Sequence, residues 1–509
     1  MSIVSFGYLA FLIVTAFIYY IIPKRFQWVI LLISSMAFLS VNSALKTLVY
    51  FATGVLVTYF GALYISKAKS EKAKKNIMIL TLTVVIAILC SLKYTNMFLR
   101  IGRGFGSIMA LSFSDKAIML LAPLGISYYT LSLIGYVLDV YWGKSIAQTN
   151  VLKHTLFTSY FPHMVSGPIV RYDDLSPQFF VGHKFDYVRV KSGFVRILWG
   201  YFKKLVIADR LSILTSTVFE NTTEYQGYYI VVAVLCFAFQ IYCDFSGCMD
   251  IVIGASEVFG IILPENFRRP FLSKDLSEFW RRWHITLGLW AKDYIFYPLL
   301  KSKFFQKIGK LAKKKIGKRY GKMIPTFLGL LTIWIIIGIW HGGNAKYVFA
   351  AGIVPWFFLV TGQIFSPIAG KFAKRLNINT ECFSYELFCR LRTLFCMCII
   401  WLFANAPSFK GNLKLLKDLY PLNNSSALLR ESLYSLNLVS KDFKIILFGL
   451  FLVLIVSILQ ERGIQIRKTL FEQNIIFQWG IELTLIFIIL IYGVYGPTYN
   501  PANFIYGGF

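Results

Sequence analysis

The sequence predicts an all-α protein that crosses a membrane many times, built as a bundle of about 11–13 membrane-embedded helices. Hydrophobic residues make up 57% and charged residues 15% of the 509 positions, whereas typical soluble domains have about 45–50% and about 25%. A soluble fold could not bury this much apolar surface, so the excess is expected to face lipid. A spanning helix needs about 20 apolar residues, and these runs reach or approach that length: 5–22, 27–41, 46–65, 76–94, 117–140, 226–263, 324–340, 347–365, 387–404, 443–459 and 475–495.

The runs differ in what they predict. The first run has no basic leader segment and no small-residue cleavage site, so we expect it to be a retained spanning helix. The 226–263 run is long enough for two membrane segments. Re-entrant or interfacial helices are expected in three amphipathic or short stretches. They cover 97–112, 152–170 and 190–218.

The domain organisation predicted from the sequence is a single membrane domain over 1–509, because no convincing internal repeat or long linker interrupts the chain. Within it we expect N-terminal helices in 1–145 and C-terminal helices in 366–509. The core between them, 146–365, contains the candidate catalytic residues described below.

The chain is strongly positive, with a net charge of +29 from 53 basic and 24 acidic residues. In a soluble protein this excess would suggest nucleic acid. Here the basic residues lie between apolar runs, so the positive-inside rule explains them and no nucleic-acid partner is expected. Placing Lys24, Arg25, 67–75 and the ten Lys/Arg of 301–322 in the cytoplasm puts the N-terminus outside. The 301–322 stretch is either a loop or a helix on the inner leaflet, whose anionic lipids attract basic residues.

The eight cysteines lie mostly within apolar runs, where they are interpreted as small buried hydrophobic residues. None has the spacing of a metal site with His, so neither a metal nor a bound cofactor is expected. Cys248 has the chemistry of a nucleophile, but no His lies near it in the sequence.

Polar groups interrupt the apolar pattern within residues 240–300. Asp244, Ser246 and Asp250 lie inside a long apolar run, and ionisable groups at membrane depth are expensive and usually functional. The alternative is that these side chains hydrogen-bond the broken backbone of a re-entrant turn at Gly247. Both interpretations can hold together.

A helix stop and a new helix start are predicted next. Pro264 and Asn266 belong to a turn, and Ser273 or Asp275 is expected to cap a helix that carries His284. On an aromatic-lined helix a single His is more often structural than catalytic. The apolar side of this helix holds Phe279, Trp280, Trp283, Leu287 and Trp290, and Arg281, Arg282, Lys292 and Asp293 surround it.

His341 is the stronger candidate because it ends the apolar run 332–340 and is followed by the helix-breaking residues 342–344. An imidazole at membrane depth is costly unless it is paired or used, and its proton affinity suits a general base. The alternative is a His bonded to a carbonyl at a helix end. His163 is interpreted as structural, and His154 and His183, beside polar, loop-like sequence, are assigned no role.

Five short motifs, in this order along the chain, resemble the membrane-bound O-acyltransferase family, and in particular its bacterial branch of alginate O-acetylation and teichoic-acid D-alanyl transfer proteins. The C-terminal segment Pro501-Ala502-Asn503-Phe504-Ile505-Tyr506 is similar to the alginate-type ending. The five motifs are Ser166-Gly167-Pro168-Ile169-Val170-Arg171, Asp244-Phe245-Ser246-Gly247, Pro264-Glu265-Asn266-Phe267, Glu278-Phe279-Trp280-Arg281-Arg282-Trp283-His284 and Trp340-His341-Gly342.

The resemblance implies many helices around a transmembrane tunnel and two functional His, which correspond to His341 and His284. It implies an O-acyltransferase that moves an acyl group, most simply acetyl, from a cytoplasmic thioester donor across the membrane to a cell-envelope polysaccharide. The family often has Tyr-Ser-Asp after the Gly of the second motif, where this chain has Cys248, Met249 and Asp250. This departure removes no expected catalytic group.

The mechanism expected from these residues is general-base acyl transfer, in which His341 takes the proton of an acceptor hydroxyl and His284 orients the donor or stabilises developing charge. Asn266, or backbone N–H groups near Gly342, would serve the oxyanion, with Asp244 and Ser246 as supporting residues. Either donor phosphates or inner-leaflet lipids are the partners expected for Arg281, Arg282 and Lys292.

The co-substrate is expected to be acetyl-CoA or another acyl thioester, such as an acyl carrier protein. Further expected partners are an extracytoplasmic acetyltransferase or polysaccharide synthase machinery, and membrane lipid, with the bacterial plasma membrane as the location. Two alternatives remain open: D-alanyl transfer to teichoic acid from a carrier protein, and a transporter or flippase of a lipid-linked glycan.

Overall fold

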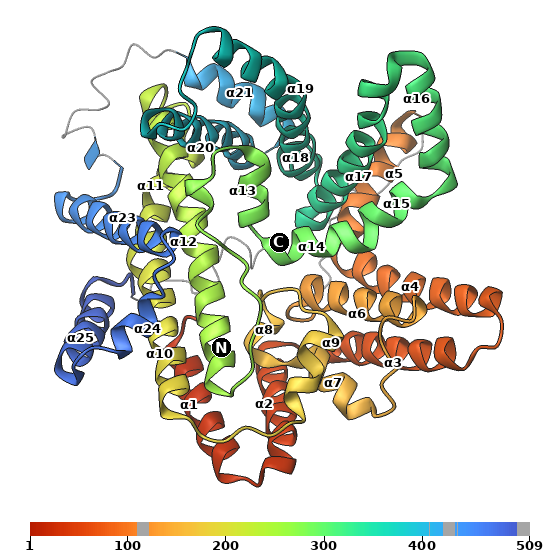
Figure 1. Cartoon of the computed structure of the whole chain (residues 1–509). Helices are drawn as coiled ribbons and strands as arrows, with labels where there is room; N and C mark the ends of the chain where they lie inside the picture. The colour runs from red at the N-terminus through yellow and green to blue at the C-terminus, as the bar shows by residue number, and fades with distance from the viewer. Residues whose placement is uncertain (109–121, 407, 421–432, 435, 496–509) are drawn as a thin grey trace. The chain divides into compact units, whose positions relative to one another are not determined.

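The regular elements of the described chain are all helical, which confirms the predicted fold class (Figure 1). The strand-like pairing found in it is an isolated antiparallel bridge between Phe267 and Trp283. The structure is a computed structural model, and it describes residues 1–108, 122–406, 408–420, 433–434 and 436–495. The C-terminal motif at 501–506 therefore lies outside the described residues, as does part of the predicted runs 97–112 and 117–140.

Within the described residues, nine helices are long and apolar enough to cross a membrane, and a tenth apolar helix, α1 (Phe6–Ile21), is shorter. The chain is thus a multi-pass membrane protein. The nine spans are Lys24–Asn42 (η1 and α2), Leu45–Lys67 (α3), Glu71–Lys93 (α4), Tyr228–Val258 (α12), Met323–Gly342 (α17), Ala345–Arg375 (α18, η6 and α19), Phe383–Asn405 (α20), Ser440–Glu461 (α23) and Ile475–Tyr492 (α25).

The 226–263 run forms one helix, α12, rather than two segments, and the re-entrant turn considered at Gly247 is absent from it. Gly247 instead allows a close helix contact, because a Cβ there would lie 2.9 Å from the carbonyl oxygen of Gly200 and 3.2 Å from the backbone nitrogen of Lys204. The glycine therefore allows close packing, and the helical assignment of α12 continues through it.

The chain divides into two compact units by its internal contacts. Unit 1 comprises Met1–Ile197 and Cys248–Pro264, and its described helices include α1 to α10 and the end of α12. Tyrosines of α1 bond that end: the Tyr19 hydroxyl donates to the carbonyl of Phe259 at 3.2 Å, and the Tyr20 hydroxyl to that of Val258 at 2.6 Å. The remaining helices of unit 1 are α5 (Thr95–Ile108), α6 (Ile126–Tyr141), α7 (Val151–Ser159), α8 (Phe161–Met164), α9 (Tyr172–Leu175), η2 (Ser176–Phe179) and α10 (Tyr187–Tyr201).

Unit 2 comprises Leu198–Gly247 and Glu265–Asn500, and all the predicted site residues lie in it. It begins with a π-helical turn, η3 (Phe202–Ala208), which is buried throughout and leads into α11 (Asp209–Glu220). Turns of this kind are rare and often occur at functional sites. The other helices of unit 2 not named so far are η4 (Pro270–Leu272), α13 (Leu276–Arg282), α14 (Ile285–Ala291), η5 (Lys292–Phe296), α15 (Tyr297–Lys301), α16 (Lys303–Gly321), α21 (Phe409–Leu419) and α24 (Ile466–Phe471).

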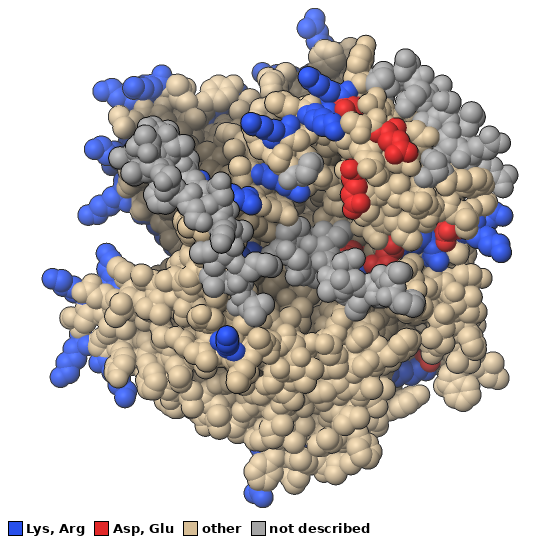
Figure 2. Space-filling model, turned by 180° about the vertical axis from the view of Figure 1, so that it is seen from behind, with Lys and Arg blue, Asp and Glu red and all other residues tan. Residues whose placement is uncertain are grey.

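The basic 301–322 stretch is helical, as the second of its two predicted interpretations required. Within α16, Phe305 and Gly309 are buried, whereas Phe304 and Leu311 are exposed beside the Lys side chains. At the upper left of Figure 2, Lys and Arg side chains project from the region of this helix, while broad areas of the same face carry no charge. A helix with exposed apolar and basic faces is typical of a membrane surface.

Candidate functional site

His284 lies between two short helices rather than inside one, so the prediction of a single amphipathic helix is wrong at this point. Helix α13 ends at Arg282, and His284 adopts a left-handed conformation with φ 45° before α14 begins at Ile285. The backbone instead pairs with the segment after Pro264: the N–H of Arg268 donates to the carbonyl of Arg282 at 2.9 Å, and the N–H of Ile285 to that of Asn266 at 3.0 Å. The predicted cap of α13 is confirmed at Asp275.

The side-chain oxygen of Asn266 fixes which ring nitrogen of His284 carries the proton. It accepts from the backbone N–H of Thr286 at 3.1 Å and from the Thr286 hydroxyl at 3.0 Å, and it lies 3.2 Å from Nδ1 of His284. A backbone N–H can only donate, so the Asn266 atom that faces it must be the oxygen, which can only accept. His284 therefore carries a proton on Nδ1, and in the neutral ring Nε2 bears the lone pair.

The surroundings of His284 favour the neutral ring. Burial lowers the pKa of His284 well below its ordinary value, and the nearby charge of His341 lowers it further. The ring of Phe245 from α12 meets the imidazole edge to face, with centroids 4.8 Å apart. A neutral imidazole protonated on Nδ1 is suited to accept a proton or a hydrogen bond at Nε2, rather than to donate one to an oxyanion there.

Asn266→Asp is expected to move the acid side of the pH–rate profile to higher pH. In the unmodified protein a neutral His284 is present above its lowered pKa, so activity that needs the neutral ring falls only as the pH drops below the ordinary range of His. A carboxylate against Nδ1 favours the imidazolium and raises that pKa. The measurement is the transfer rate as a function of pH.

Asn266→Leu is the matched control, because it removes the acceptor without adding charge. It is expected to lower the rate at every pH and to leave the acid side of the profile where it was or at lower pH. An unshifted profile in Asn266→Asp would show that protonation of His284 does not limit the rate.

His341 lies near the end of α17, as predicted, where Gly343 has φ 68° and closes the helix in a left-handed cap. The imidazole is 8% exposed. The ring of Trp340 lies near both histidines, with its centroid 4.9 Å from that of His341 and 6.3 Å from that of His284. The structure therefore brings together two residues that are 57 positions apart in the sequence, in one buried, aromatic-lined place of unit 2.

Asp244 and Ser246 are both buried in α12, on either side of the residue that contacts His284, and they face two buried lysines. Nζ of Lys204 lies 2.6 Å from a carboxylate oxygen of Asp244 and 2.7 Å from one of Asp209. Nζ of Lys203 donates to the hydroxyl of Ser246 at 2.8 Å. Both lysines come from the π-helical turn η3.

Sequence reasoning missed this lysine pair, although a signal for it exists. Two consecutive lysines stand in an otherwise apolar stretch at 202–208, and cations at membrane depth are expensive and usually functional. The expectation of a re-entrant or interfacial helix over 190–218 singled out neither lysine within it. The structure gives Lys203 and Lys204 exposures of 4% and 2%.

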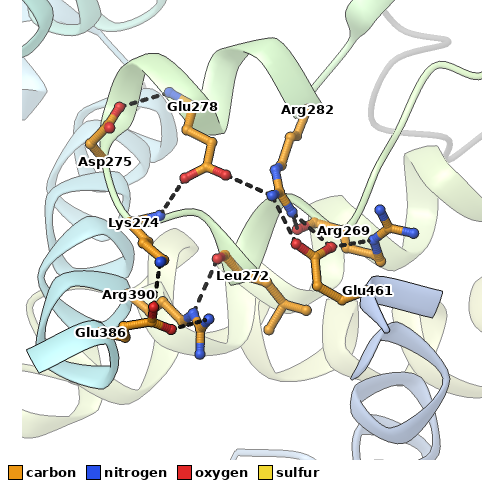
Figure 3. A network of polar contacts seen from close by, with 9 residues as sticks. All are labelled: Arg269, Leu272, Lys274, Asp275, Glu278, Arg282, Glu386, Arg390 and Glu461. Atoms are coloured by element: carbon orange, nitrogen blue, oxygen red, sulfur yellow. Dashed lines mark hydrogen bonds and ion pairs between the residues drawn. The ribbon is translucent and has the colours of Figure 1, made fainter. Parts of the chain in front are cut away.

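The three basic residues predicted to meet the donor divide into two groups. Arg281 and Lys292 are exposed. The guanidinium of Arg282, in contrast, pairs with Glu278 at 2.6 Å and with both carboxylate oxygens of Glu461 at 2.9 and 3.0 Å (Figure 3). Arg282 therefore has carboxylate partners within the protein, and its binding to the donor stays a prediction.

The remaining histidines and the cysteines are not among the residues that contact His284 or His341 in the contacts described above. His154 is fully buried, against the expectation of a loop-like setting, and its Nε2 lies 3.0 Å from the hydroxyl of Thr58. Burial lowers the pKa of His154 to about 3 and that of His163 to about 4. All eight cysteines are free, and Cys248 is buried in α12.

A family model describes the region that contains this site. The model of the membrane-bound O-acyltransferase family matches residues 145–403, about half of the chain. The chain belongs to the membrane-bound O-acyltransferase family. The matched region includes His284, His341 and the Asp244 segment, whereas α23 and α25 of this O-acyltransferase family member lie outside it.

Several relatives share this region of the family. A probable alginate O-acetylase of Pseudomonas aeruginosa is 32% identical over 340 residues, which are 65% of this chain and 60% of the relative. A peptidoglycan O-acetyltransferase of Helicobacter pylori is 28% identical over 73% of this chain and 70% of the relative. A teichoic acid D-alanyltransferase of Bacillus subtilis is 28% identical over 45% and 56%. The chain thus matches 60% of the length of the alginate-type relative, and the relatives agree with the predicted bacterial branch.

Proposed function

We propose that this protein is a membrane O-acyltransferase that moves an acetyl group from a cytoplasmic thioester donor across the membrane, for O-acetylation of an extracellular or cell-wall polysaccharide. The observation that carries the proposal is the pair of buried imidazoles, His284 and His341, which lie near the same Trp340 ring within the region that matches the family. The names of the alginate and peptidoglycan relatives support acetyl as the group and a glycan as its destination.

In the proposed reaction the acceptor hydroxyl oxygen attacks the carbonyl carbon of the thioester, and the carbon–sulfur bond breaks. His341 takes the proton of the hydroxyl and returns it to the departing thiolate. General-base help of this kind is worth about 10²–10⁴-fold. Nε2 of His284 accepts a hydrogen bond from the reacting groups or from His341, and the amide nitrogen of Asn266 is the part of that residue able to serve an oxyanion. No bound cofactor takes part; acetyl-CoA is the proposed co-substrate.

The proposed location is the bacterial plasma membrane with the N-terminus outside, which places the basic helix α16 at the inner leaflet. Proposed partners are the acyl donor, an extracytoplasmic acetyltransferase that receives the acyl group or a polysaccharide synthase machinery, and anionic lipid. Arg281 and Lys292, both exposed, are the proposed contacts for donor phosphates.

Two alternatives are weaker. D-alanyl transfer from a carrier protein is supported by a relative that matches only 45% of this chain, against 65% for the alginate-type relative. A transporter or flippase would not need two buried imidazoles in one site. Membership of a family of acyltransferases also speaks against it.

The donor is tested with purified protein in vesicles, given acetyl-CoA labelled in the acetyl group. We expect label to appear on a hydroxyl-bearing glycan acceptor, with release of one thiol for each acetyl group transferred. In a parallel reaction with a carrier protein labelled in its D-alanyl group, transfer of that label alone would favour D-alanyl transfer to teichoic acid. Movement of the glycan across the vesicle membrane without transfer of either group would favour a transporter or flippase.

A further inference from the structure

The backbone around His284 needs support from outside its own segment. Two non-glycine residues in it have left-handed conformations, Arg269 with φ 49° and His284 with φ 45°. Such conformations are disfavoured and persist where the surrounding structure over-determines them. The two segments that carry them, 266–269 and 282–285, are joined to each other by the isolated bridge between Phe267 and Trp283 and by the side chain of Asn266 on His284.

One carboxylate holds both segments together from the side. Glu461, the last residue of α23, accepts from Nη1 and Nη2 of Arg282 at 3.0 and 2.9 Å, and its Oε2 lies 2.6 Å from Nε of Arg269 (Figure 3). Arg282 is two positions from His284, and Arg269 is three from Asn266. Isolated surface ion pairs contribute little, but two-pronged arginine–carboxylate pairs within a network are the exception.

We propose that Glu461 is a positioning residue that fixes the orientation of His284 through Arg269 and Arg282. The expected effect of Glu461 on the reaction rate rests on the proposed acyl transfer. Glu461 is separated from Arg282 by 179 positions, and α23 lies beyond the residues 145–403 that match the family. Helix α23, which lies outside the matched region, thereby helps to hold the backbone that carries His284.

A second glutamate in Figure 3, at the other end of the same network, provides a matched control. Glu386 of α20 pairs with Lys274 at 2.5 Å and with Arg390 at 3.0 Å. Its side chain is 28% exposed and that of Glu461 is 32% exposed. Each glutamate joins two cations in unit 2, but Glu386 bonds neither Arg269 nor Arg282. Lys274 reaches Arg282 only indirectly, through its backbone N–H on Glu278.

The experiment compares Glu461→Gln with Glu386→Gln in the full-length protein. We expect Glu461→Gln to lower kcat on the order of 10-fold with KM for the donor nearly unchanged, because a displaced catalytic group loses rate rather than binding. Glu386→Gln should stay within about 2-fold of the unmodified rate. Glu461→Asp, which keeps the charge, should recover part of the loss.

Hydrogen–deuterium exchange of residues 265–287 tests the same proposal without substrate. The bridging amides of Arg268 and Ile285 should exchange faster in Glu461→Gln and remain protected in Glu386→Gln. Equal exchange in the two variants, or an unchanged kcat in Glu461→Gln, would overturn the proposal. If the unmodified protein transfers no acetyl group, the proposed function fails, and the exchange comparison alone then decides the role of Glu461.

Discussion

His341→Ala is expected to lower the rate of acyl transfer by about 10²–10⁴-fold, the usual contribution of a positioned general base. His341 is buried near the end of α17, close enough to His284 for its charge to lower the pKa of that residue. Removing the imidazole takes away the proposed acceptor of the hydroxyl proton, while α17 and its left-handed cap at Gly343 are expected to remain. The measurement is transfer of labelled acetyl groups by protein reconstituted in vesicles.

His183→Gln is the control for this substitution. His183 lies in unit 1, and its Nε2 bonds the backbone carbonyl of Gln178 at 2.9 Å, so it should keep the unmodified rate. Both variants should insert into the membrane and elute as the unmodified protein does. Transfer by His341→Ala at more than a tenth of the unmodified rate would remove His341 from the mechanism.

Lys204→Met is expected to destabilise the protein by about 3–5 kcal/mol, the cost of breaking a buried ion pair by removing one partner. Its ammonium lies within 2.7 Å of carboxylate oxygens of both Asp209 and Asp244, and the side chains of the three residues are at most 9% exposed. Without the cation, two buried carboxylates face each other at membrane depth. The measurement is the temperature at which the detergent-solubilised protein unfolds.

Two further variants separate the loss of charge pairing from the loss of a lysine. Lys307→Met, on the exposed side of α16, should change the free energy of unfolding by about 0.5 kcal/mol or less. Adding Asp244→Asn to Lys204→Met should recover part of the stability, because one uncompensated charge is removed. A loss in Lys204→Met no larger than that in Lys307→Met would contradict the buried ion pair.

The membrane-spanning helices could be predicted from the sequence because lipid imposes a simple demand. A segment such as 324–340 must be apolar over nearly its whole length, and the residues Gly342 and Gly343 mark where it ends. His341 was identified for the same reason, since a polar ring at that position stands out against its neighbours.

The break at His284 could not be predicted, because it depends on contacts distant in the sequence. The aromatic spacing from Phe279 to Trp290 favours one continuous helix. The left-handed backbone is held instead by the Asn266 oxygen, the pairing with Arg268 and the carboxylate of Glu461. None of these leaves a local signal in the segment that they shape.

Gly247 illustrates a different difficulty, that of a residue with two structural uses. A glycine in a polar part of an apolar run favours a turn, and a turn was considered there. In the structure the same lack of a side chain permits close approach of the backbone at Gly200. Which use applies depends on the neighbouring helix, and a single sequence does not specify that neighbour.

If His341 is the base of the proposed reaction, the length of α17 determines the depth at which the acyl group is transferred. Eighteen residues separate Met323 from His341, which is about 27 Å at 1.5 Å per residue, nearly the 30 Å or so of a hydrocarbon core. The basic helix α16 ends two residues before α17 begins. If the proposed donor stays among the head groups beside α16, only its narrow acyl-bearing end has to cross the hydrocarbon core to reach His341. A bulky acceptor at the opposite surface then needs to dip in only slightly, so a polymer could be served without ever entering the lipid.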